Sequence, residues 1–129
     1  MATLPIRKIP GLKSWATATV TTAADGLSDV IDIGGFGLRS IQMSTAWTAA
    51  NMTFNGSVSS SASLKSVRVT TAATELTYVS SSGYIMNVNP NNFAGLRFIQ
   101  LRSGTTAVPV AQAAARSIVL GLTAIDHPK

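Results

Sequence analysis

The sequence lacks cysteine altogether and has a single histidine, His127, among its 129 residues. Without cysteine there is no disulfide, no thiolate nucleophile and no cysteine-ligated zinc, so packing or assembly has to stabilise the fold. His127 stands beside Pro128 near the end of the given sequence, where no neighbouring pattern predicts that its ring is held in place. A general base needs a fixed position within hydrogen-bond reach of its proton. These absences argue against an enzyme, and we expect no catalytic residue.

Acidic residues are also scarce, with five against ten lysines and arginines, so the formal net charge is +5. Asp29 and Asp32 have opposite parity in one β-prone run and should project to opposite faces, which argues against a paired-carboxylate glycosidase site. Asp25 and the asparagines around Pro90 could offer oxygen ligands to calcium, but such residues in turns more often bond to the local backbone. We therefore expect no metal ion and no cofactor.

Long apolar runs and aromatic residues are few. The longest apolar stretch, around residues 118–122, is far shorter than the roughly 20 residues that cross a bilayer, so no membrane partner is expected. The sequence also begins without the apolar run of a secretory signal, which predicts a protein used without export by that route. Aromatic residues make up 6% of the chain, and only Arg97 and Arg102 lie near one, Phe98. Single-strand binders interleave basic residues with exposed rings, so nucleic acid is not expected either.

Small and hydroxylated residues are abundant instead, with 30 serines and threonines and 18 alanines in a chain that is 46% hydrophobic and 12% charged. Short β-prone runs alternate with turn residues at the spacing of roughly 8–12 residues that is typical of a sandwich or barrel. This pattern predicts an all-β antiparallel sandwich of eight or nine strands, with at most a helical turn at residues 46–51 or 90–94. The candidate strands are residues 16–21, 30–33, 38–43, 52–58, 64–70, 75–79, 84–88, 96–102 and 116–122.

Residues 1–14 differ from the rest, and we predict an extended arm there, followed by a single β domain at residues 15–129. Pro5, Pro10 and Gly11 interrupt any helix, and each proline favours extended backbone before it. A frayed terminus would explain a polar segment, but this one is rich in aliphatic residues and suits docking on a partner. Fully extended, it could reach about 45 Å. The arm residues expected to bind a partner are Leu4, Ile6, Arg7, Lys8, Ile9, Leu12 and Lys13.

The run at residues 96–102 carries apolar side chains at both parities, and Ile118, Val119 and Leu120 repeat this pattern. A sandwich core uses one parity only, so the other is covered either by a loop or by another subunit. The nearly uncharged loop at residues 104–115 is similarly open to two interpretations, a functional loop or one packed over the end of its own fold. Arginines suit carboxylates on a protein partner. The sandwich residues predicted to bind a partner are Arg97, Ile99, Leu101 and Arg102.

Several short motifs keep a definite order along the chain. They include Ala46 to Phe54 (AWTAANMTF), Tyr84-Ile85 through Asn89-Pro90, Phe93 to Phe98 (FAGLRF) and Leu101 to Thr105 (LRSGT), with further matches at residues 27–35, 41–43, 74–77 and 116–118. In this order and spacing, over roughly residues 16–122, the chain resembles a group of small virion proteins of tailed bacteriophages. The resemblance implies a jelly-roll-like β-sandwich at the surface of the capsid, assembled in the cytoplasm of the bacterial host.

The same resemblance implies a capsid decoration or cement protein that binds the major capsid protein on the outer head shell and stabilises contacts between its subunits. Because several copies around a symmetry axis multiply weak contacts, we also expect self-association, with a trimer at local threefold positions as the first expectation. Two regions depart from the family: residues 57–65 are serine-rich and end basic where the family often has an acidic, glycine-rich loop, and the arm lies outside the resemblance. The alternative is a head-fibre or tail-associated glycan-binding module that uses Trp47 or Tyr84.

Overall fold

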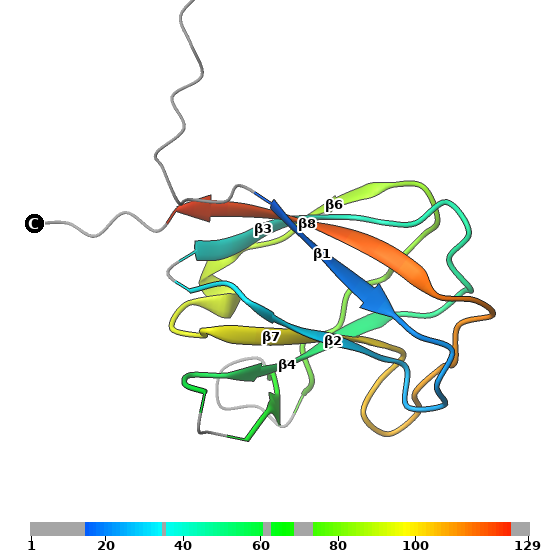
Figure 1. Ribbon diagram of the computed structural model, residues 1–129, viewed down its shortest axis with the longest axis horizontal. Helices are drawn as coiled ribbons and strands as arrows, with labels where there is room; N and C mark the ends of the chain where they lie inside the picture. Colours follow the sequence, from blue (N-terminus) through cyan, green and yellow to red (C-terminus); the bar gives the residue numbers. More distant parts are fainter. Residues whose placement is uncertain (1–14, 35, 61–62, 69–73, 125–129) are drawn as a thin grey trace, which may run out of the picture.

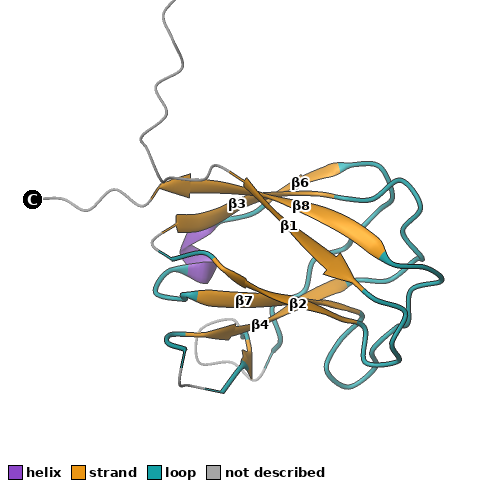
Figure 2. Cartoon of the chain, viewed as in Figure 1, coloured by secondary structure: helices purple, strands orange, loops and turns teal. Residues whose placement is uncertain are grey.

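The computed structural model of the chain describes residues 15–34, 36–60, 63–68 and 74–124. Within these residues the chain forms eight β-strands and one short 3-10 helix, and every strand pair is antiparallel (Figures 1 and 2). The predicted all-β class is therefore confirmed. The strands are β1 (Trp15–Val20), β2 (Leu27–Asp32), β3 (Phe36–Gln42), β4 (Met52–Ser57), β5 (Lys65–Ser66), β6 (Ile85–Asn87), β7 (Phe98–Ser103) and β8 (Arg116–Ala124), with the helix η1 (Pro90–Phe93) between β6 and β7.

The eight strands form one curled sheet in the order β5-β4-β7-β2-β1-β8-β3-β6. Each strand pairs with its mirror in chain order, because β1 pairs with β8, β2 with β7, β3 with β6, and β4 with β5. Contacts between β1 and β2, β3 and β8, and β4 and β7 join these pairs into the continuous sheet. Segments that are far apart in the sequence are thus neighbours in most of the sheet.

The sheet curls over, so that β1, β8, β3 and β6 lie opposite β2, β7 and β4 in Figure 1. A single cluster of buried hydrophobic side chains from both halves packs between them. Leu38, Ile118 and Leu120 come from one half and Phe54 and Leu101 from the other, and none of the five has exposed surface. Because successive side chains of a strand point to opposite faces, the alternate residues of these strands form the outer faces of the sheet.

Strand β4 is buried along its whole length. Met52 and Phe54 belong to the hydrophobic core, whereas the side chains that alternate with them, Thr53 and Asn55, make polar contacts. The Thr53 hydroxyl donates to the Gly104 carbonyl at 2.8 Å, and the Asn55 amide donates to Gln100 Oε1 at 3.1 Å. Strand β4, next to the edge strand β5, is therefore covered on both faces within this fold.

Two of the nine predicted strands are largely absent. Among residues 64–68, the described part of one of these runs, regular strand is present only at β5, and residues 75–79 contact their neighbours through isolated bridges, from Glu75 to Arg68 and from Tyr78 to Met52. The segment bonds to β4 at separated points, since the Val67 amide donates to the Phe54 carbonyl and the Tyr78 amide to the Met52 carbonyl, each at 2.9 Å. Strand β4 is too short to form a continuous hydrogen-bonded ladder with both β5 and residues 75–79. Residues 75–79 therefore have no free strand edge with which to pair, despite their β-propensity.

The helical turn predicted at residues 90–94 is present as η1. Pro90 stands at its start, where the missing N–H is no loss, and the Asn89 side chain accepts a bond from the Asn91 amide at 3.0 Å. The other site considered for a helical turn, residues 46–51, contains no helix. There the indole N–H of Trp47 donates to the Ala50 carbonyl at 3.1 Å, so the buried ring closes a turn.

The long loop after β7 is tied to the body of the fold. Gln112 is buried, and its side chain accepts from the Thr48 amide at 2.7 Å and donates to the Thr48 carbonyl at 3.1 Å and to the Ser103 hydroxyl at 2.8 Å. The Gly104 amide donates to the Asn51 carbonyl at 2.7 Å. Of the two interpretations of this loop, packing over the end of its own fold is the one that these contacts support.

Candidate functional site

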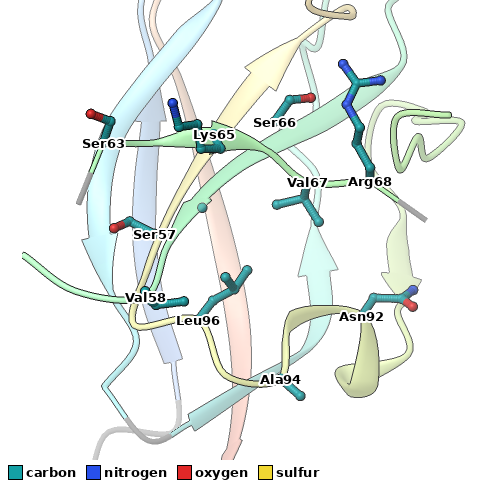
Figure 3. Close-up of a pocket in the computed structure, with 11 residues that line it drawn as sticks. Ser57, Val58, Ser63, Lys65, Ser66, Val67, Arg68, Asn92, Ala94 and Leu96 are labelled. Atoms are coloured by element: carbon teal, nitrogen blue, oxygen red, sulfur yellow. The ribbon is translucent and has the colours of Figure 1, made fainter. Parts of the chain in front are cut away.

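A hollow of about 450 Å³ lies between the segment that contains β4 and β5 and the segment that contains η1 (Figure 3). Its lining residues come from three parts of the chain that the sheet topology brings together. They are Gly56, Ser57, Val58, Ser63, Lys65, Ser66, Val67, Arg68, Asn92, Ala94 and Leu96.

The hollow has an apolar centre and a basic side. Figure 3 shows Val67 and Leu96 approaching each other across it, while Lys65 and Arg68 extend from the segment that follows residue 62. Both basic side chains are exposed, and the lining contains no acidic residue. Gly56 has a structural role here, because a Cβ at this position would lie 2.7 Å from Leu96 Cδ1. The arrangement suits an anionic group held beside an apolar surface.

A second candidate surface is the outer face of β1, β8, β3 and β6. The strand registers align Thr17, Val119, Gln42 and Ile85 in one row across the four strands. They align Trp15, Gly121, Ser40 and Asn87 in the next row. We call this surface the outer β1–β8–β3–β6 face; its members are Trp15, Thr17, Thr19, Ser40, Gln42, Ile85, Asn87, Ser117, Val119, Gly121 and Thr123.

None of these eleven residues is charged, although the chain carries a net charge of +5. A few positions determine which parts of this surface protrude and which are recessed. Trp15 is 60% exposed and Ile85 is 64% exposed, and the two lie on opposite edge strands of this four-stranded half. Between them, a Cβ on Gly121 would meet the Ser40 hydroxyl, so the centre of the face stays low. Charged residues adjoin these positions: Arg39, exposed at the bulge of β3, precedes Ser40, and Arg116 precedes Ser117 on β8. At the β1 edge, the Asp29 carboxylate accepts from the Thr19 amide at 2.8 Å.

The charged residues of the second half of the sheet are organised differently. Arg102 of β7 is buried and contacts Glu75 Oε2 and the Thr106 hydroxyl through Nη1, at 3.3 and 2.7 Å, and Asn55 Oδ1 through Nη2, at 3.2 Å. Glu75 also accepts from the Thr106 amide at 3.0 Å, from the Thr106 hydroxyl and from the Ser66 hydroxyl at 3.0 Å. This network, which we call the Arg102 cluster, ties residues 66, 75 and 106 onto β4 and β7.

The electrostatics of Glu75 reflect this position. Burial alone would raise the pKa of the carboxyl group, but the hydrogen bonds from Thr106 and Ser66 and the charge of Arg102 outweigh it. The pKa of Glu75 therefore lies below the ordinary glutamate value, and the residue is ionised at neutral pH. The Arg102 cluster holds together three segments of the chain and leaves little of its charge for a partner.

Of the four sandwich residues predicted to bind a partner, Arg97 is the one that the structure leaves exposed. Its side chain contacts Asp32 at 3.3 Å, and its guanidinium lies 5.3 Å from the centroid of the Phe98 ring. The hydrogen bond from Arg97 lowers the pKa of Asp32, assisted by the Gly34 amide and against a smaller effect of burial. Arg97 thus presents a charge on the surface that is already paired within the chain.

The other three sandwich predictions need correction. Ile99 and Leu101 have no exposed surface and belong to the core, because their parity on β7 is the inner one. Arg102 is on the outer parity but is buried within its own cluster. Ile99, Leu101 and Arg102 therefore present little or no surface to a partner in this structure, whereas Phe98 and Gln100 on the outer parity of β7 are half-buried.

Some of the remaining site residues predicted from the sequence lie in the described part of the structure, and others lie outside it. The arm residues Leu4, Ile6, Arg7, Lys8, Ile9, Leu12 and Lys13 lie outside them. Trp47 is 5% exposed and fills the core, whereas Tyr84 is 67% exposed just before β6. The outer β1–β8–β3–β6 face was not selected from the sequence, although Val119, at the centre of one row, belonged to the run that was apolar at both parities.

Other kinds of site were sought in the same residues. Within the part of the chain that the structure describes, no group of three or more histidine, cysteine, aspartate or glutamate side chains is placed to hold a metal ion. No helix among the described residues is long and apolar enough to cross a membrane. Comparison of the chain with protein-family models, with curated proteins and with solved structures gives no match.

Proposed function

We propose that this chain is a structural protein of a bacteriophage particle, a decoration or cement protein that binds the outer head shell. The single observation that carries the proposal is the uncharged outer β1–β8–β3–β6 face, on a chain whose net charge is +5. Interface centres are depleted of charge, as these eleven residues are, and Trp15 at the edge of the face is of a residue type that interfaces favour. The order and spacing of motifs such as Ala46 to Phe54, which resemble small virion proteins, support a bacteriophage as the source of the particle.

We also propose that the strands wrap as a jelly roll. In that architecture a long hairpin rolls up, so that the first strand pairs with the last and each later strand with its mirror. The pairing of β1 with β8, β2 with β7, β3 with β6 and β4 with β5 supports this description. A fold of this kind places its two outer faces away from each other, which allows a protein to contact two neighbours.

The proposed mechanism is thermodynamic linkage between binding of this protein and the stability of the shell. A protein that binds only the assembled shell stabilises the shell by the free energy of that binding, and copies around a symmetry axis multiply weak contacts. The partner is the major capsid protein, and self-association as a trimer at local threefold positions remains a prediction. The cations of the arm, Arg7, Lys8 and Lys13, would meet acidic surface of the shell.

The test is co-sedimentation of the purified chain with head shells of the phage that encodes it. We expect saturable binding and a higher temperature of shell disruption when the chain is bound. Deleting residues 1–13 is expected to weaken binding at least tenfold while the circular dichroism spectrum stays β-rich. A chain that neither occurs in purified particles nor binds their shells would contradict the proposal, and unchanged occupancy after the deletion would remove the arm from it.

The second candidate function, a glycan-binding module of a head fibre or tail, is favoured by one observation, the exposed ring of Tyr84. Trp47 cannot contribute to a sugar platform, because its ring is buried. An array of bacterial surface glycans separates the two functions, since a decoration protein is expected to give no signal. A signal that disappears in Tyr84→Ala and persists in Val108→Ala, a change at an equally exposed position (67%), would establish the second function instead.

A further inference from the structure

We propose that residues 1–14 of one copy cover the outer β1–β8–β3–β6 face of a neighbouring copy, and that this exchange is the contact through which the chain self-associates. The inference rests on the proposed self-association but does not require that the assembly be on a capsid. It assigns an interaction surface and one occupant, a defined segment of this same chain.

The first step is the surface. Across its rows the face presents hydroxyl, amide and small apolar side chains, with Val119 at the centre of one row and Gly121 at the centre of the next. Both edges of the whole sheet are very short strands, β5 of two residues and β6 of three, so they offer little for strand addition. A partner is therefore received on the face, in the low centre between Trp15 and Ile85.

The second step is the segment. Residues 1–14 join the described chain at Trp15, which is itself a member of the outer face. Four adjacent strands span about 15–20 Å across, and nine extended residues span about 30 Å. The aliphatic residues of the segment are spread over just such a length, from Leu4 to Leu12. The segment is therefore long enough to cross all four strands.

The third step is charge. The segment carries Arg7, Lys8 and Lys13, which would be repelled by a basic surface such as the one around Lys65 and Arg68. The eleven members of the outer β1–β8–β3–β6 face are uncharged, and the charged residues that adjoin it are of both signs: Arg39, Arg116 and the Asp29 carboxylate that accepts from the Thr19 amide. The segment can place its aliphatic side chains there while its three cations remain in water.

The choice of a neighbouring copy follows from direction. β1 starts at Trp15, so the segment joins the face at that end of β1. Pro5 and Pro10 favour extended backbone at the residues before them, and this preference argues against a reversal onto the chain's own face. Each copy then gives its segment to one neighbour and receives a segment from another. Such a head-to-tail contact closes into a ring, of which the trimer is the expected size.

The experiment measures the mass of the full-length chain by sedimentation over a concentration series. We expect an oligomer, and at least tenfold weaker association both for a segment variant, Ile6→Asp with Ile9→Asp, and for a face variant, Val119→Lys. Ile85→Lys, at an exposed edge position, repeats the face test without the risk that attends a half-buried residue. Val108→Lys, at a position as exposed but off the face, is the matched control and should associate as the unaltered chain does.

Mixing the two kinds of variant gives the deciding result. A segment variant keeps an intact face, and a face variant keeps an intact segment, so the mixture should form a one-to-one dimer although neither variant associates alone. A monomeric full-length chain would overturn the proposal, and so would a mixture that stays monomeric. Loss of association in the face variants alone would also overturn it, because the faces would then pack on each other. Shell binding is measured separately, so an intact shell interaction would leave the proposed function standing when the exchange fails.

Discussion

Replacing Phe54 by alanine is expected to lower the free energy of unfolding by about 4 kcal/mol, because it empties the centre of the core. Phe54 has no exposed surface, and its ring packs edge-on against Phe93 and Tyr78, with centroids 4.9 and 5.9 Å away. These contacts join β4 to η1 and to the segment before β6. The loss therefore combines the transfer of a large side chain, a cavity and two aromatic contacts.

Chemical denaturation of the full-length chain and of Phe54→Ala measures this difference, and the thermal midpoint should fall by roughly 10–20 °C. Val58→Ala is the control, since Val58 follows β4 directly but is 67% exposed, and its effect should stay within about 0.5 kcal/mol. A loss below about 1 kcal/mol for Phe54→Ala would mean that η1 and the Tyr78 segment do not pack on β4 as described.

Replacing Arg102 by methionine is expected to cost about 3 kcal/mol at pH 7, because a buried ionised partner is left without its cation. Glu75 would keep its bonds from Thr106 and Ser66 but lose the guanidinium, and Asn55 Oδ1 would lose its donor. Changing Glu75 to glutamine in the same chain removes the unpaired charge. We therefore expect the double variant to be more stable than Arg102→Met alone, and a double-mutant cycle measures the coupling.

Arg97→Met is the matched control for this experiment. The Arg97 to Asp32 pair has the same 3.3 Å separation as the Arg102 to Glu75 pair, but its side chains are 57% and 48% exposed, against 10% and 12%. An exposed ion pair contributes between about 0 and 1 kcal/mol. Equal losses in Arg97→Met and Arg102→Met would contradict the assignment of the Arg102 cluster as the lock between segments.

The cost of Arg102→Met should depend on pH in a definite direction. The pKa of Glu75 in the folded chain is below its value in the unfolded chain, so its stabilising contribution is complete above the unfolded pKa and is lost as pH falls through the folded one. A protonated Glu75 no longer requires a cation. The difference in stability between the unaltered chain and Arg102→Met should therefore narrow as pH is lowered from 7 toward 3, and a difference that widens would assign the cost to another cause.

The outer sides of β7 and β8 show how much of the candidate site the sequence pattern could predict. The apolar residues at both parities of residues 96–102 and 118–120 indicated that some outer face is covered, and this inference applies to both strands. On β7 the cover is the chain's own Arg102 cluster, built from residues 66, 75 and 106. On β8, Val119 lies within an outer face for which no cover is described. The partner residues chosen on β7, Ile99, Leu101 and Arg102, are buried in this structure, and the same signal was present on β8.

The hollow lined by Lys65, Arg68 and Leu96 could not be predicted from the sequence either. Residues 57–65 stood out as a serine-rich stretch with a basic end, which drew attention to this region without locating a cavity. The hollow requires that Leu96, before β7, pack against Gly56 of β4. That juxtaposition depends on the curl of the sheet and on the turn made by η1.

The sequence by itself determined the class of the fold, the turn at Pro90 and the poverty of catalytic groups, because these follow from local properties: β-propensity, proline geometry and the side chains present. Only the tertiary structure decided which parity of each strand is inside. A period of two defines two faces but does not say which is buried, and in strands apolar on both faces the hydrophobic pattern cannot choose. It also decided which distant strands pair, since β1 with β8 and β2 with β7 are contacts that no local pattern encodes. The tertiary structure also brought uncharged residues that are far apart in the sequence together on one outer face, which begins at Trp15.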